Sequence, residues 1–228
     1  MSEITKMTFK VHKPLWERFD EQISRMPVKR DPFLSSVLRR ETPRLATAMA
    51  GKRLSGKANR WVSTQLNRLD RQGGIKPVNI GIDADVAADL KQVVTDSNMV
   101  RDAFFNRLIA FLRASDALLD FFELPRKVDG SVGSSYGSDL LMPASPLANL
   151  EDTFADPLWY LHMAAEEKHE TCLYLLPFQS PDMDGFECWM DDANVPGTRH
   201  NKKARLELET LSWEENEFDL VAFGKRGQ

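Results

Sequence analysis

The sequence predicts an α+β protein with a mainly helical N-terminal region that contains two strands, followed by a small antiparallel sheet with a helix. Three observations predict this class. Two segments repeat the same order of strand, helix and helix. Each segment begins with alternating apolar and polar residues and continues with apolar residues at helical spacing. Toward the C-terminus, one helical stripe is followed by short alternating runs that turn residues separate.

The two repeated segments align without a gap at a separation of 71 residues. The run Met7-Thr8-Phe9-Lys10-Val11 of the first copy corresponds to Val78-Asn79-Ile80-Gly81-Ile82 of the second. Further equivalent pairs are Leu15 and Val86, Phe19 and Leu90, Ile23 and Val94, Leu34 and Phe105, and Val37 and Leu108. Apolar character is kept at these positions while neighbouring residues differ, which indicates two copies of one structural unit.

Each copy is expected to form one strand and two helices. Residues 7–11 and 78–82 alternate in the manner of strands. The first helix of copy one is predicted by Leu15, Trp16, Phe19, Ile23 and Met26. The second helix is expected to begin near Asp31, or near Asp102 in copy two, because a carboxylate suits the positive end of the helix dipole. Pro32 also fits an N-terminal helix position.

One short strand with two helices can neither pair its own edge nor cover its apolar face. Two units in one chain can pair their strands as an antiparallel ribbon and lay four helices over one side. The residues expected to face this core are Met7, Phe9, Val11, Val78, Ile80 and Ile82. Those expected to face outward are Lys6, Thr8, Lys10, Asn79 and Gly81. A two-stranded ribbon fits the major groove of DNA, where polar side chains reach base edges.

On these residues the chain resembles the ribbon-helix-helix superfamily of bacterial and phage DNA-binding proteins. In copy one the resemblance rests on residues 7–11, on the helix that starts near Leu15, and on Val28-Lys29-Arg30-Asp31-Pro32-Phe33-Leu34. It covers residues 5–45 and 76–113. Members of this family usually form dimers, so a tandem pair implies a pseudo-dimer within one polypeptide.

The resemblance implies that outward strand residues contact bases and that the start of each second helix holds phosphate. The implied base contacts are Lys6, Thr8, Lys10, Asn79 and Gly81. The implied phosphate contacts include Lys29, Arg30 and Arg101. Copy two carries Gly81 where copy one has Lys10, and Val100 where copy one has Lys29. Two alternatives stay open for copy two: it contacts few bases, or it serves mainly as a structural partner.

Charge is divided unevenly along the chain. Residues 1–76 hold 17 Lys and Arg against 7 Asp and Glu, residues 77–147 hold 6 against 10, and residues 148–228 hold 7 against 17. A basic region joined to an acidic one is typical of a nucleic-acid-binding protein with an appended module. Residues 44–72 are basic and predict one short amphipathic helix. Lys52, Arg53 and Lys57 of this segment are expected to contact the DNA backbone, although a solvated connector explains the same charge.

Composition predicts three parts of the chain. Residues 1–125 hold the tandem repeats and a short helix at 117–124, and residues 126–147 form a Gly/Ser-containing linker. Residues 148–228 form an acidic α+β module. In this module Asp156-Pro157 predicts a helix start, with Leu158, Leu161 and Ala165 as the apolar stripe. The strands expected after it are Cys172–Phe178, Phe186–Met190, Arg205–Leu211 and Phe218–Phe223.

Catalytic and metal-binding patterns are not recognisable in the sequence. The set His162, His169, Cys172, Cys188 and His200 lacks the close ligand spacing of zinc sites. Nucleophile elbows and glycine-rich phosphate loops are also absent from the sequence. We therefore expect no enzyme activity, no metal and no cofactor. The sequence has no membrane-spanning apolar run, no apolar signal segment and only two cysteines, which predicts a cytoplasmic protein.

The leading hypothesis from the sequence is sequence-specific binding of double-stranded DNA through the ribbon, as a transcriptional repressor or as an accessory factor at a plasmid, phage or conjugation locus. The acidic residues 148–228 would then bind a protein partner or a second copy of themselves. The alternative is an interaction or inhibitor protein, antitoxin-like or anti-defence, whose acidic C-terminal segment binds a basic partner.

Overall fold

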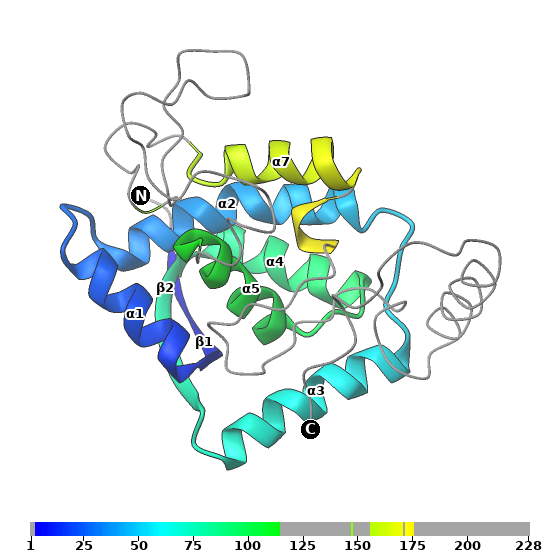
Figure 1. Ribbon diagram of the computed structural model, residues 1–228, viewed down its shortest axis with the longest axis horizontal. Helices are drawn as coiled ribbons and strands as arrows, with labels where there is room; N and C mark the ends of the chain where they lie inside the picture. The colour runs from blue at the N-terminus through cyan, green and yellow to red at the C-terminus, as the bar shows by residue number, and fades with distance from the viewer. Residues whose placement is uncertain (1–2, 115–146, 148–155, 171, 176–228) are drawn as a thin grey trace, which may run out of the picture.

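The order of strand, helix and helix occurs twice in the structure, which is a computed structural model that describes residues 3–114, 147, 156–170 and 172–175. Copy one comprises β1 (Ile4–His12), α1 (Lys13–Ser24) and α2 (Arg30–Ala48), and copy two comprises β2 (Ile75–Asp83), α4 (Ala84–Asp96) and α5 (Arg101–Arg113). Helix α3 (Gly56–Arg71) connects the copies, and α7 (Trp159–His169) and a turn of 3-10 helix, η1 (Leu173–Leu175), follow them. The described part is thus mainly helical with one small sheet (Figure 1).

β1 and β2 pair antiparallel as the two-stranded sheet that the repeat predicted, here called the ribbon. Thr8 lies directly opposite Asn79, and these two residues are 71 positions apart, so each is the equivalent of the other in the repeat. An approximate twofold axis therefore passes between them. Lys6 lies opposite Gly81, which is the equivalent of Lys10. The two halves of the ribbon are related by symmetry in backbone but differ in side chains.

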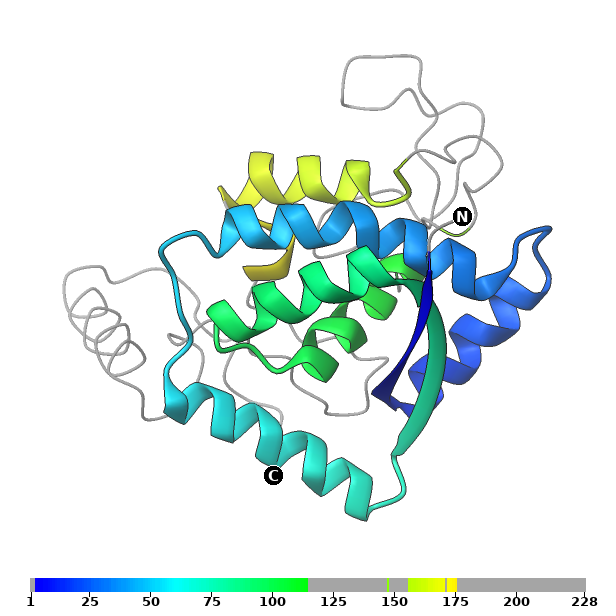
Figure 2. The ribbon, with the colours of Figure 1, turned by 180° about the vertical axis from the view of Figure 1, so that it is seen from behind.

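The inner face of the ribbon is buried as expected. Phe9, Val11, Ile80 and Ile82 are fully buried, Val78 is nearly so, and Met7 is half-buried. The ring of Phe9 stacks on that of Phe105 from α5, with centroids 4.0 Å apart. Burial of aromatic and branched side chains supplies most of the favourable free energy of folding here. The helices of both copies cover this face (Figure 2).

The segment between the copies is more helical than the sequence predicted. Helix α2 continues past Pro43 to Ala48, because Leu45 and the following Met49 are buried. Helix α3 then runs for 16 residues instead of forming one short helix. Ser55 caps its start, with the hydroxyl accepting a hydrogen bond from the Ala58 N–H at 3.1 Å. Its buried stripe is Ala58, Val62 and Leu66.

Helix α7 lies alongside α2 (Figures 1 and 2). Its predicted apolar stripe of Leu158, Leu161 and Ala165 is fully buried, which confirms that part of the prediction. The predicted start was two residues early, because the helix begins at Trp159. Asp156 lies in the preceding turn, where its carboxylate accepts a hydrogen bond from the Leu158 N–H at 3.3 Å.

The strand predicted at Cys172–Phe178 is wrong over residues 173–175, which form η1. Tertiary packing overrides the local pattern there, because the buried Tyr174 ring lies 5.0 Å from Phe104 and 5.6 Å from Phe111, centroid to centroid. The other three predicted strands, the helix at 117–124 and the linker at 126–147 fall outside the described residues, apart from Leu147, which is buried. Among the described helices, none is both long and apolar enough to cross a membrane.

Candidate nucleic-acid interface

The outer face of the ribbon presents polar side chains. Lys6, Thr8, Lys10 and Asn79 are exposed and Gly81 is half-buried. At the approximate twofold axis, the Thr8 hydroxyl donates to the Asn79 side-chain oxygen at 2.7 Å. The structure therefore brings together the five residues that were predicted to contact bases. Asn79 uses its side-chain oxygen in this pair. Its amide nitrogen belongs to an exposed side chain and carries N–H donors of the kind that an adenine edge accepts from asparagine.

Lys10 is held at the edge of this face by helix α3. Its ammonium group lies 2.7 Å from the carboxylate of Asp70, in the last turn of α3. The hydrogen bond and the charge of Asp70 raise the pKa of Lys10 above its ordinary value, so the amine stays protonated. The contact places the C-terminal end of α3 beside the ribbon. Any DNA phosphate or base that Lys10 contacts must compete with Asp70 for it.

The start of α2 lies close to the ribbon at Gly81. The Gly81 N–H donates to the Asp31 carboxylate at 2.9 Å. A Cβ atom added to Gly81 would lie 3.2 Å from Ile4 Cγ2. Gly81, Lys6 and Asn79 line a hollow of about 790 Å³ with residues of α2. Copy two therefore leaves an open space at the position where copy one presents the Lys10 side chain.

The second helix of each copy begins next to the ribbon with an arginine. Arg30 bonds to Asp31 at 2.8 Å and to Asp20 at 3.3 Å. Arg101 donates to the Thr8 carbonyl at 2.6 Å and to Asp102 at 3.1 Å. In neither helix does the N-cap side chain, Lys29 or Val100, cap the free N–H groups. Each helix start thus places a cationic side chain beside N–H groups that the N-cap side chain does not cap.

The predicted phosphate contacts Lys52, Arg53 and Lys57 lie away from this group. They occur around the start of α3, where Arg53 donates to the Asp96 carbonyl at the end of α4, at 2.8 Å. A helix of this length spans about 24 Å, and its other end adjoins the ribbon (Figure 2). The structure therefore divides the predicted phosphate contacts into two clusters.

Two exposed arginines in the last turn of α3, Arg68 and Arg71, belong to the basic segment 44–72 but were not named with Lys52, Arg53 and Lys57 as phosphate contacts. The Lys10–Asp70 ion pair places that turn beside the ribbon. The sequence carried a signal for them, since both precede the Gly73-Gly74 turn that leads directly into β2. Arg68 and Arg71 therefore lie closer to the ribbon than Lys57, which is at the other end of α3.

The chain matches no protein-family model, and neither the curated proteins nor the solved structures include a detectable relative. The candidate interface therefore rests on the geometry of the chain itself. Within the described residues, no group of three or more His, Cys, Asp and Glu side chains is placed to hold a metal ion.

Proposed function

We propose that this protein binds double-stranded DNA sequence-specifically as an intramolecular ribbon-helix-helix pseudo-dimer, with its ribbon in the major groove. The observation that carries the proposal is the pairing of Thr8 with its own repeat equivalent, Asn79, at the centre of an exposed polar face. Such a ribbon has the width that the major groove admits, and its alternate side chains reach base edges. The proposed role is that of a transcriptional repressor or of a plasmid, phage or conjugation accessory factor.

The helix starts on either side of the ribbon support this proposal. Uncapped N–H groups and the helix dipole favour a phosphate oxygen at the start of α2 and of α5. Lys29 beside the first start and Arg101 at the second add cationic charge. Contacts of this kind supply affinity and fix the position of the ribbon, while the outward strand residues supply sequence preference.

Selection of bound sequences from random duplex DNA tests the proposal. The full chain should enrich one motif, and its affinity for that motif should fall steeply as salt concentration rises, because bound phosphates release counterions. Replacing Thr8 and Asn79 together by alanine should abolish the enrichment while leaving the chain folded. Enrichment of no motif, or an affinity insensitive to salt, would contradict the proposal.

A second candidate function is supported by the internal contacts of the ribbon face. Thr8 bonds to Asn79, Lys10 to Asp70, and Arg101 to the Thr8 carbonyl. A face whose polar groups already pair with one another also suits an assembly scaffold, in which the acidic residues 148–228 bind a basic partner. In that case the Thr8 and Asn79 alanine variant would retain the biological activity of the protein. DNA selection would then yield no motif.

A further inference from the structure

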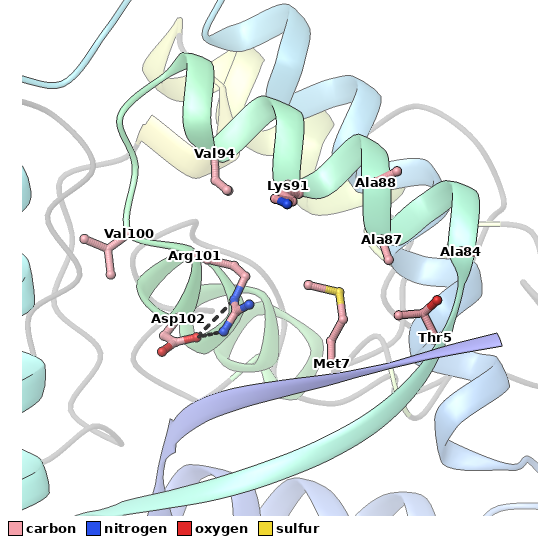
Figure 3. Close-up of a pocket in the computed structure, with 10 residues that line it drawn as sticks. All are labelled: Thr5, Met7, Ala84, Ala87, Ala88, Lys91, Val94, Val100, Arg101 and Asp102. Atoms are coloured by element: carbon pink, nitrogen blue, oxygen red, sulfur yellow. Dashed lines mark hydrogen bonds and ion pairs between the residues drawn. The ribbon is translucent and has the colours of Figure 1, made fainter.

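Strand β1, helix α4 and the start of α5 form an apolar pocket of about 480 Å³ that is separate from the outer ribbon face (Figure 3). Met7, Ala87 and Val94 contribute its apolar lining, and Lys91, Arg101 and Asp102 bring charge to it. In Figure 3 the Met7 and Arg101 side chains extend into the space beneath α4. This volume lies in the range of small-molecule sites, which are mostly apolar with a few polar groups.

The repeat explains why copy two has this pocket. Ala87 is the equivalent of Trp16 in copy one, because the two positions are 71 residues apart. The Trp16 indole is 1% exposed and packs against Phe19, with ring centroids 5.3 Å apart. In copy one the Trp16 indole therefore fills this position. In copy two the same position holds only the methyl group of Ala87. The structure contains both the filled and the vacant form of one site.

The charged residues beside the filled form and the vacant form also differ. In copy one Arg30 lies over the Trp16 ring, 5.5 Å from its centroid, and bonds to Asp20 at 3.3 Å. The equivalent of Asp20 in copy two is Lys91. Copy two thus lacks both the aromatic ring and the second carboxylate, Asp20, to which Arg30 bonds in copy one. A cation stands in place of the missing carboxylate.

The remaining charges favour an anion in the vacant form. Arg101 keeps Asp102 as its partner but lies over Phe9, 5.0 Å from the ring centroid. Within the described part of the chain, no ion pair engages the Lys91 amine. Lys91, Arg101 and Asp102 together give the pocket a net charge of one positive unit. Coulomb attraction in a partly enclosed site therefore selects a singly negative ligand over a cationic one.

We propose that this pocket binds a small planar aromatic molecule that carries one carboxylate. Its ring takes the position that the Trp16 indole occupies in copy one, and its carboxylate lies between Lys91 and Arg101. The apolar lining stabilises the ring by burial, and Arg101 can turn from Phe9 to lie over it, as Arg30 does over Trp16. This inference does not depend on DNA binding and is tested without DNA.

Calorimetric titration of the full chain with indole-3-acetate, 3-methylindole and heptanoate tests the chemistry of the ligand. Indole-3-acetate should bind at one site per chain. The uncharged 3-methylindole and the non-aromatic heptanoate should each bind at least about tenfold more weakly. Failure of indole-3-acetate to bind, or equal binding of heptanoate, would overturn the proposal whatever the outcome of DNA selection.

Two variants locate the binding in this pocket. Ala87→Trp combined with Met7→Val gives this pocket the pair of residues, Trp16 and Val78, found at the equivalent positions of the filled form, so the chain has a precedent for packing them. This variant should lose indole-3-acetate binding by at least about tenfold. Lys91→Asp keeps the apolar lining intact and should weaken binding by a similar factor through charge reversal.

Ala46→Trp is the matched control, because it adds the same side chain at an exposed position on α2. It should bind indole-3-acetate as the unmodified chain does. Undiminished binding by both pocket variants would place the ligand elsewhere and overturn the proposal.

Discussion

The side chain of Asn106, on α5 of copy two, closes the end of the strand of copy one at His12. Its oxygen accepts a hydrogen bond from the His12 N–H at 2.8 Å, and its nitrogen donates to the Lys10 carbonyl at 2.9 Å. Copy one makes the corresponding contact, in which the Ser35 hydroxyl accepts from the Asp83 N–H at 3.1 Å. Ser35 and Asp83 are the repeat equivalents of Asn106 and His12. Each copy therefore bonds to the backbone of the other, so reciprocal hydrogen bonds join the two repeats.

Replacement of Asn106 by alanine is expected to destabilise the protein by about 2 kcal/mol, because it removes the hydrogen bonds to the buried His12 N–H and to the part-buried Lys10 carbonyl. Urea denaturation followed by circular dichroism measures this loss. Asn67→Ala is the matched control, since Asn67 is exposed on α3, and a change within about 0.5 kcal/mol is expected for it. Equal stability of the two variants would show that the Asn106 contacts do not join the copies.

Replacement of Asp70 by asparagine is expected to raise affinity for DNA. The change removes a negative charge beside the ribbon and frees the Lys10 ammonium group, which Asp70 now holds at 2.7 Å. One additional phosphate contact should steepen the dependence of log affinity on log salt by about 0.9. Stability should change little, because both side chains are well exposed. Filter binding or fluorescence anisotropy at several salt concentrations measures the slope.

Asp89→Asn provides the control for charge alone. Asp89 is exposed on α4, and its replacement changes the net charge of the chain by the same amount. Equal gains in affinity for Asp70→Asn and Asp89→Asn would show that general repulsion, and not release of Lys10, produces the effect.

The ribbon and its core could be predicted from the sequence because their signal is periodic. Met7, Phe9 and Val11 alternate with polar residues, and the same pattern returns 71 residues later, which predicted both the strands and their pairing. The length of α3 could not be predicted, since its buried stripe of Ala58, Val62 and Leu66 is short and begins with a small side chain. The local pattern can suggest an amphipathic segment, but packing against the rest of the fold decides where it ends.

The sequence could not predict which side chains pair with the candidate site residues. Lys10 and Asp70 are 60 positions apart, and only the folded chain brings them together. The pocket beside Ala87 was also missed, although the alignment of the repeats placed Ala87 opposite Trp16. The change of residue volume at an equivalent position was the available signal. The strand predicted over residues 173–175 was wrong for another reason. There the alternating pattern was present, but aromatic packing around Tyr174 overrides it.

Two buried tyrosines are expected to make the protein sensitive to alkali. Burial, and then the charge and hydrogen bond of Glu41, raise the pKa of Tyr174 well above its ordinary value. Burial alone raises the pKa of Tyr160. A raised pKa in the folded state means that the neutral tyrosine stabilises the fold. This stability is fully present below the unfolded pKa of about 10 and is lost as pH rises above it.

The two tyrosines should differ when each is replaced by phenylalanine. Tyr174→Phe removes a hydrogen bond to the buried Glu41 carboxylate and should cost about 2 kcal/mol near neutral pH. The buried Tyr160 hydroxyl has no hydrogen-bond partner among the described residues, so Tyr160→Phe should be neutral or slightly stabilising. Both variants should lose less stability than the parent chain between about pH 9 and pH 11. Chemical denaturation across this range measures the effect, and identical pH profiles for all three chains would contradict the assignment.

The ribbon is expected to select an asymmetric DNA site, because its two halves share a backbone arrangement but not their side chains. Lys6 and Lys10 project from β1, while their equivalents in β2 are Pro77 and Gly81. Half of the selected motif should therefore be strongly specified and the other half weakly. Pro77→Lys supplies copy two with the equivalent of Lys6 at an exposed position. Selection with this variant should increase information in the weak half and make the motif more nearly palindromic, whereas Lys6→Ala should weaken the strong half. A palindromic motif from the unmodified chain would show that copy two contacts bases through groups other than these strand side chains.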